Sequence, residues 1–287
     1  MRLRYINSVG KELILDAWPD RRHFILQSWE GFGEVPITLQ TRKSPYQDGV
    51  SLVGQLLEPR HLSLEIVIYG TDKQEVYDRR RFIQNLFNPK LGVGRLDWTQ
   101  PDGKTYSIGV IPDGSPAFPA GDARSRVHQV AMVDLIAPDP AWTDTTDTNI
   151  LIASVIGRFR FPLTLPTEMG VLDNERIVIN DGDMPAPVVI TFNGPLVNPM
   201  IQNKTTGEFV RVKQTLKDNE KLLIDTSFGS KRVVFIDSEG NQKNAFGSID
   251  LESQFWWLNV GENHLIYSTD SGIGTVMLRY KQRYVGV

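Results

Sequence analysis

Histidine is the side chain most often used for acid–base chemistry near neutral pH, and this chain has four: His23, His61, His128 and His264. No two of them lie four residues apart, and none has a carboxylate at the spacing of a zinc or hydrolase motif. The chain has no cysteine, which excludes a disulfide, a thiolate nucleophile and a thiolate metal site. We therefore expect no catalytic residue, no metal site and no cofactor, and we predict that the protein is not an enzyme.

Two weaker patterns could still bind something. Asp181 and Asp183 could act as a carboxylate pair or as calcium ligands, but the glutamate that would close a calcium loop is missing. Trp256 and Trp257 are adjacent aromatic residues that could stack on a sugar. The alternative reading, which we favour, places one indole in a core and the other at a domain or subunit contact.

A cluster of arginines lies in the one segment that reads as a helix, residues 72–88. Asp72 followed by Glu75 is typical of a helix start, and apolar residues recur at helical spacing after it. Arg79 and Arg80 could contact another subunit. Because Glu75 lies one turn before Arg79, an ion-paired, solvated helix face is the simpler reading.

Length and composition exclude several classes of protein. A chain of 287 residues predicts two domains, and 40% hydrophobic residues are enough for two cores. A net charge of -3 provides no basic field, so we expect no nucleic-acid partner. No apolar run reaches fifteen residues, and residues 1–6 read as a strand rather than a signal peptide. We expect a soluble protein without membrane insertion or a cleaved leader.

The first domain is predicted over residues 1–141 as a β-sandwich with the helix at 72–88. Short alternating runs separated by turns precede and follow the helix. In the run 62–69, every second residue is apolar, which is typical of antiparallel sheet with one dry side. The polar segment 43–49 reads as a protruding loop.

The second domain is predicted over residues 142–287, after a proline-rich, polar tract at 137–147 that reads as a linker. About ten short runs, among them 159–163 and 249–251, indicate a sandwich or jelly roll. The end of the chain predicts a closing β-hairpin, with Trp256 and Trp257 at the end of one strand and Val276, Leu278 and Tyr280 on one face of the last.

This ending resembles that of the distal tail (Dit) proteins of long-tailed bacteriophages. The residues that carry the resemblance are Trp257, Leu258, Gly261, Glu262, Asn263, Ile266, Tyr267, Gly274, Thr275, Val276, Tyr280, Tyr284 and Gly286. Looser matches, such as 31–33 in the first half and 193–199 in the second, extend it over nearly the whole chain. The sequence departs from the family at Asp181-Gly182-Asp183, where many members have Phe-Gly-Asp.

The resemblance implies an all-β structural protein with a jelly-roll-like, galectin-like second domain. It implies a homo-oligomeric ring, expected to be a hexamer, in the phage tail tip of the virion, assembled in the host bacterial cytoplasm. The implied partners are the tail tube protein, the tail tip or tail-associated lysin protein, and receptor-binding proteins or host glycans. We expect Arg42, Tyr46, Gln47, Arg79 and Arg80 at the subunit interface.

A competing hypothesis is a carbohydrate-binding module that attaches to host cell-wall glycans through the second domain. The jelly-roll pattern and the pair Trp256-Trp257 motivate it. Both hypotheses predict binding without catalysis.

Overall fold

The computed structural model describes residues 2–16, 23–156 and 171–287, which form two compact units. One unit contains the residues up to Thr145 together with Tyr284–Val287, and the other contains Thr146–Arg283. The chain therefore passes between the units twice. Strands dominate both, and the described residues contain a single α-helix, so the predicted mainly-β class is confirmed.

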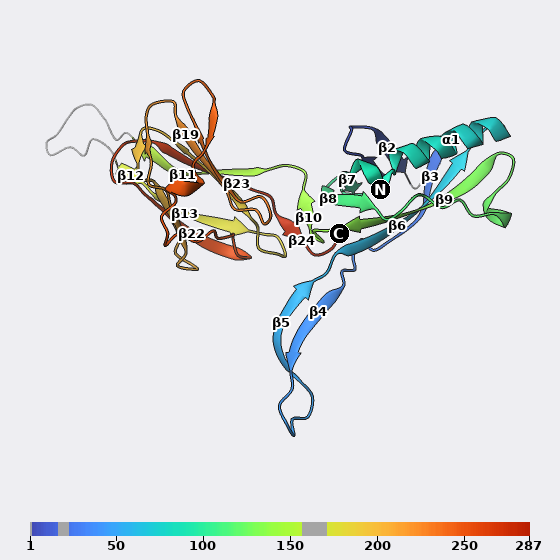
Figure 1. Cartoon of the computed structure of the whole chain (residues 1–287), viewed down its shortest axis with the longest axis horizontal. Coiled ribbons are helices and arrows are strands. Elements are labelled where there is room, and N and C mark those ends of the chain that lie inside the picture. Colours follow the sequence, from blue (N-terminus) through green and yellow to red (C-terminus); the bar gives the residue numbers. More distant parts are fainter. Residues whose placement is uncertain (1, 17–22, 157–170) are drawn as a thin grey trace. The chain divides into compact units, whose positions relative to one another are not determined.

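The described residues of the first unit form eleven strands. Figure 1 labels most of them. They are β1 Arg2–Ile6, β2 Glu12–Asp16, β3 Phe24–Glu30, β4 Ile37–Arg42, β5 Ser51–Leu57, β6 Arg60–Tyr69, β7 Gly94–Thr99, β8 Thr105–Pro112, β9 His128–Ala137, β10 Trp142–Asp144 and β24 Arg283–Tyr284. Seven of them pair in the order β8-β7-β1-β2-β3-β6-β9, and β9 pairs again with β8. The pairing closes on itself, so the expected sandwich takes the form of a barrel, which has fewer open edges.

The α-helix, α1 (Lys73–Leu86), packs against β6 and β9, and its bounds agree closely with the predicted 72–88. Asp72 caps it by accepting a hydrogen bond from the backbone N–H of Glu75 at 2.9 Å. Its apolar stripe is buried, and the ring of Phe87 stacks on Tyr5 at 4.4 Å. The described residues also form three short 3₁₀ segments: η1 Pro89–Leu91, η2 Gly121–Ala123 and η3 Phe246–Ser248.

The barrel core contains the alternate residues of β6 that the sequence placed on one face, Leu62, Leu64, Ile66 and Ile68, each at most 1% exposed. It also contains Trp142, which is fully buried although it lies in the proline-rich tract expected to be a linker. β10 pairs this tract with β8, which draws the indole into the first unit.

The described residues of the second unit form thirteen strands, most of them in two main antiparallel sheets that enclose one core. They are β11 Thr148–Ile156, β12 Val171–Asp173, β13 Glu175–Asn180, β14 Val188–Asn193, β15 Leu196–Val197, β16 Met200–Asn203, β17 Phe209–Arg211, β18 Thr215–Leu216, β19 Lys221–Asp225, β20 Arg232–Ile236, β21 Gln242–Asn244, β22 Gly261–Ser268 and β23 Thr275–Tyr280. The sheets run β12-β11-β23-β14-β19-β20-β21 and β13-β22-β16-β17. The predicted strand 159–163 lies outside the described residues. The predicted strand 249–251 is wrong, because only an isolated bridge from Ile249 to Val212 is present.

The predicted closing hairpin is also wrong. β22 and β23 lie in different sheets, and no strand ends at Trp256 or Trp257. The loop between the strands crosses from one sheet to the other over the segment 193–196. A Cβ atom at Gly272 would lie 2.3 Å from Pro195 O, and one at Gly274 would lie 2.1 Å from Asn193 O, so only glycine permits this path. The predicted faces of β23 are confirmed, with alternate residues buried.

Candidate interaction surfaces

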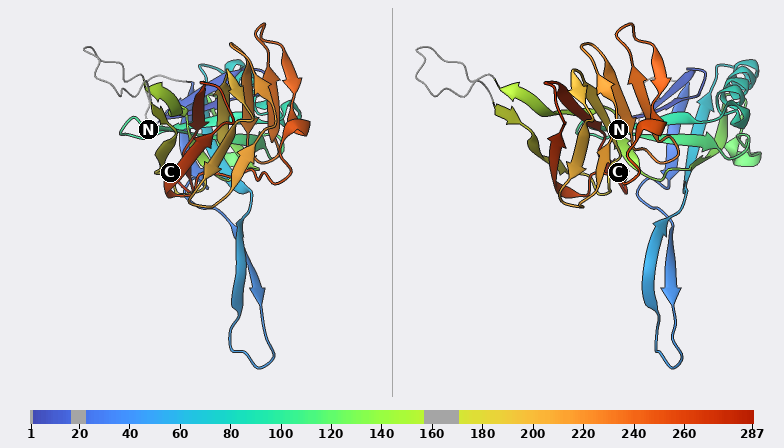
Figure 2. Two further views of the ribbon diagram at one scale, coloured as in Figure 1. Left: turned by 90° about the vertical axis from the view of Figure 1, so that its left-hand side faces the viewer. Right: turned by 60° about the vertical axis from the view of Figure 1, so that its left-hand side comes forward.

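The hairpin formed by β4 and β5 extends away from the barrel and pairs only with itself (Figures 1 and 2). Every residue of β4 is exposed, as are five of the seven residues of β5. Its strands pair directly from Ile37 with Leu57 to Arg42 with Ser51, with one register shift between Gln40 and Thr41 that leaves Val53 without a direct partner in the ladder. Isolated two-stranded hairpins are marginally stable in water. The exposure of both strands shows that the first unit leaves the hairpin uncovered.

The pairing register gives the hairpin one apolar and one mainly polar face. Ile37, Leu39 and Leu52 share a face, because residues two apart and residues directly opposite point the same way. Their exposed fractions are 48%, 55% and 60%. The other face carries Thr38 and Gln40, with Leu56 as its apolar exception. Hence we define the apolar hairpin face as Ile37, Leu39, Leu52 and Leu57.

The turn of the hairpin contains three of the residues expected at a subunit interface. Gln47 organises it: its side-chain oxygen accepts from the backbone N–H of Ser44 at 3.1 Å, and its amide donates to the hydroxyl of Ser51 at 2.9 Å. Tyr46 is fully exposed in the left-handed region, at φ 63°. Arg42 is the last residue of β4. The structure thus brings Arg42, Tyr46 and Gln47 together, and their role at an interface stays a prediction.

Arg79 and Arg80 lie on α1 and are engaged within their own unit. Arg79 forms an ion pair with Glu75 and donates to the backbone oxygen of Tyr69. The guanidinium of Arg80 lies over the Phe118 ring at 4.4 Å and over the Tyr77 ring at 5.0 Å. These contacts hold the helix against its neighbours. The expectation that Arg79 and Arg80 lie at a subunit interface stays a prediction.

Trp256 and Trp257 differ in environment. The Trp256 side chain is 1% exposed in the core of the second unit, so neither face of its ring meets solvent. Trp257 is partly exposed, its indole nitrogen donates to Thr226 O at 2.9 Å, and the Arg283 guanidinium lies 5.5 Å from its ring centre. Trp256 is therefore a core residue, and a contact of Trp257 with a glycan, a domain or a subunit stays a prediction.

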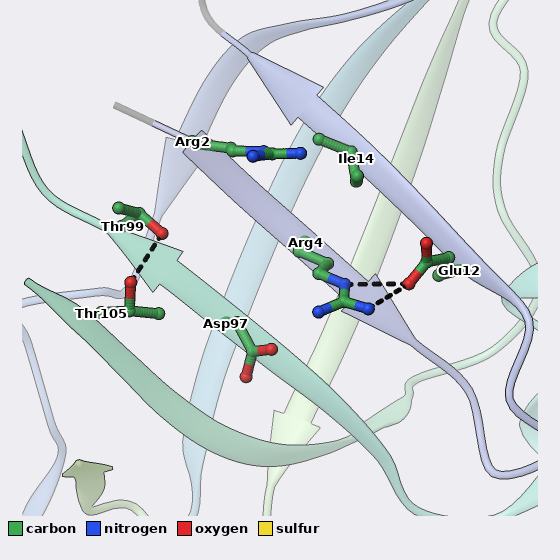
Figure 3. A pocket seen from close by; sticks show the side chains of 7 residues that line it. All are labelled: Arg2, Arg4, Glu12, Ile14, Asp97, Thr99 and Thr105. Carbon is green, nitrogen blue, oxygen red and sulfur yellow. Dashed lines mark hydrogen bonds and ion pairs between the residues drawn. The ribbon is translucent and has the colours of Figure 1, made fainter. Parts of the chain in front are cut away.

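A surface hollow of about 380 Å³ lies on the outside of β1, β2, β7 and β8 (Figure 3). Arg4 and Glu12 point toward each other within it, and the Glu12 carboxylate raises the pKa of Arg4. Asp97 accepts from the hydroxyl of Ser107 at 2.8 Å and pairs with Arg95 at 3.0 Å. These carboxylates are matched to nearby donors, which is the arrangement of a structural ion-pair network rather than of an acid–base pair.

Two further hollows, of about 400 and 210 Å³, adjoin on the face of β3, β6 and β9 that points away from the core, and both include Glu65 and Met132. Two of their carboxylates are engaged: Ser28 donates to Glu65 and Ser63 donates to Asp134, each at 2.6 Å. Across the described ranges, no group of three or more acidic or histidine side chains could hold a metal ion. No helix in those ranges is long and apolar enough to cross a membrane.

Two protein-family models match separate parts of the chain. A model of the siphovirus-type tail component, C-terminal domain, matches residues 181–284, and a model of the phage tail protein RIFT-related domain matches residues 19–125. No curated protein sequence matches the chain significantly.

Solved structures share the whole fold at low sequence identity. The Dit protein of phage SPP1, described as a paradigm of the hub adsorption apparatus in phages that infect Gram-positive bacteria, is 12% identical, with 98% of each chain covered and a TM-score of 0.71. Chains from the phage p2 baseplate in its activated conformation, with calcium or with strontium, are 10% and 11% identical, with full coverage and TM-scores of 0.57 and 0.58.

The fold and the family models define a non-enzymatic structural component of a phage tail. More narrowly, the chain belongs to the siphovirus Dit family of distal tail proteins, which act as the tail or baseplate hub at the tail tip of the virion. The family, function and location predicted from the sequence are confirmed.

Proposed function

We propose that copies of this chain close into a ring at the end of the tail tube, and that the hairpin β4–β5 supplies a contact between neighbouring copies. The observation that carries this proposal is the apolar hairpin face, with three large side chains about half exposed. Burial of apolar area contributes roughly 25 cal/mol per Å². A neighbouring copy provides that burial at every subunit in turn, because a closed ring leaves no hairpin unmatched.

The family resemblance supports six copies, with the tail tube protein on one side of the ring and the tail tip or tail-associated lysin protein on the other. Receptor-binding proteins complete this set of partners, and assembly takes place in the host bacterial cytoplasm. The turn residues Arg42, Tyr46 and Gln47 border the hairpin contact, since tyrosine and arginine are common anchors of protein interfaces. Contacts that are weak one by one become strong when a ring engages a ring.

Substitutions on the two faces of the hairpin test the proposal. The double variant Leu39→Ser/Leu52→Ser removes apolar area from the apolar face, and Thr38→Ala/Gln40→Ala changes the polar face as a matched control. Mass would be measured by size-exclusion chromatography with light scattering, and ring shape by negative-stain imaging. We expect the first variant to shift the population strongly toward monomer and the control to assemble like the wild type.

Assembly could require a partner, so the same measurement is repeated with the tail tube or tail tip protein added. A wild-type chain that stays monomeric at high concentration and forms no ring with either partner would contradict the proposal. Equal assembly of both variants would instead remove the hairpin from the contact.

Binding of host glycans by the second unit is tested separately with the full chain on a glycan array. Trp257→Ala removes the partly exposed indole. Glycan binding that this substitution abolishes would add an adhesion role to the hub. If the wild type binds no glycan, the adhesion role is removed and only the structural role remains.

A further inference from the structure

Arg60, the first residue of β6, is fully buried and donates hydrogen bonds to five backbone carbonyl oxygens. The acceptors belong to three separate segments of the chain. Three of them lie in the segment that leads into the hairpin. One lies just before the chain enters the second unit, and one lies just after the chain returns from it. They are Gly31 at 2.8 Å, Phe32 at 2.9 Å, Glu34 at 2.5 Å, Pro140 at 2.9 Å, and Val285.

The segment 31–34, which we call the hairpin root, is held from both sides. On one side it lies against β6, where a Cβ atom at Gly31 would come within 1.9 Å of the backbone oxygen of His61. On the other side the end of the chain lies against it, where a Cβ atom at Gly286 would come within 2.9 Å of Gly33 O. The indole of Trp142 donates to Phe32 O at 3.1 Å. The root therefore has little room to turn.

Arginine suits this position better than any other residue. Its planar guanidinium presents five N–H donors in a fixed fork, whereas lysine presents three donors from a single atom. Burial lowers the pKa of Arg60, so the charge is desolvated at a cost. The carbonyl oxygens offset that cost, and without Arg60 each of them would lose a charged donor, with Phe32 O keeping only the Trp142 indole.

We propose that Arg60 is a positioning residue for the hairpin β4–β5, and that the last residues of the chain lock the root through Val285. This proposal rests on the role of the hairpin in ring formation. Val285 is synthesised after the whole second unit, so the hairpin root is completed only after that unit has been made. A full-length chain presents an ordered hairpin for assembly, and a chain that stops before Val285 does not.

Hydrogen exchange on the full-length protein tests the positioning role directly. Arg60→Met keeps an extended side chain but removes the guanidinium donors from the five carbonyls, and Arg60→Lys restores part of the donor set. We expect amide exchange in residues 31–35 to rise about tenfold or more in Arg60→Met, with an intermediate rise in Arg60→Lys. Arg2→Met, on an exposed arginine of the same barrel, is the control and should leave this exchange unchanged.

Gly33 and Gly286 lie against each other and give a second test. It leaves Arg60 unchanged, so it applies even if Arg60→Met fails to fold. In Gly286→Ala the new methyl group is forced against Gly33 O, whereas in Gly33→Ala it meets open space. We expect faster exchange of the root in Gly286→Ala and wild-type exchange in Gly33→Ala. Deletion of Val285–Val287 should reproduce the effect of Gly286→Ala.

The ring is measured on the same variants by light scattering. We expect Gly286→Ala and the deletion to assemble less than Gly33→Ala. Unchanged exchange in Arg60→Met and Gly286→Ala would overturn the positioning role, and so would normal assembly of variants whose root exchanges faster. If the wild type forms no ring under any condition, the proposed ring function fails, while the exchange data still decide whether Arg60 orders the root.

Discussion

The hairpin β4–β5 and the strand pair β6–β9 are neighbours in the first unit and share antiparallel geometry, yet they differ in what covers them. Along β6, alternate side chains are at most 1% exposed in the barrel core. Along β4, the same alternation leaves Ile37 and Leu39 about half exposed. Alternation in the sequence therefore indicates which side of a strand prefers to be dry. It does not indicate whether the apolar side is buried by the same chain or by another one.

The largest expected effect comes from comparing a leucine of the strand pair β6–β9 with a leucine of the hairpin β4–β5. Leu64→Ala in β6 leaves a cavity in the core and should lower the free energy of unfolding by about 2–5 kcal/mol. Leu39→Ala on the hairpin should change it by less than about 0.5 kcal/mol in the monomer. Urea denaturation at low protein concentration measures both. Similar losses in the two variants would mean that the hairpin packs within the monomer.

The next effect concerns alkaline pH and the buried ring of Tyr5 in the barrel. Burial raises the pKa of Tyr5 to about 12, so the folded state keeps its phenol proton where the unfolded chain loses it. The corresponding stability is fully present below pH 10 and is lost as the pH rises toward 12, a loss of roughly 2 kcal/mol.

Tyr5→Phe should flatten this decline, and chemical denaturation between pH 9 and 11.5 would show it. Tyr46→Phe, at the exposed turn of the hairpin, controls for removal of a phenol. A decline that is equally steep in wild type and Tyr5→Phe would assign the alkaline loss to other groups.

The smallest effect is on the helix that supports β6 and β9. Asp72→Ala removes the capping bond to the backbone of Glu75 and should cost about 1 kcal/mol of unfolding free energy. Asp78→Ala, on the exposed surface of the same helix, should cost less. Because α1 contacts the barrel, the loss should appear in barrel amides by hydrogen exchange and leave the hairpin amides unaffected.

Local patterns predicted the elements that depend on neighbours in sequence. The cap at Asp72 and the helical spacing after it placed α1, and strict alternation placed the buried faces of β6 and β23. These signals are local because a helix turn or a strand pair with a dry side imposes its period on adjacent residues.

Features that depend on distant residues were not predicted. The sequence gives no sign that β9 returns to β8, or that β22 and β23 lie in different sheets, because pairing partners are chosen by the whole core. The role of Arg60 was also missed, since a single arginine beside a strand looks like any solvated charge. The one available signal was an arginine at the start of an otherwise apolar alternation.

The double passage of the chain makes the second unit an insertion within the first, bounded by Thr145 and Tyr284. A recombination event that exchanged only the inserted residues would leave both segments of the first unit, up to Thr145 and from Tyr284 onward, in place. The first unit of a tail hub can thus persist while the inserted unit is replaced, which gives related phages a route to vary one unit without rebuilding the other.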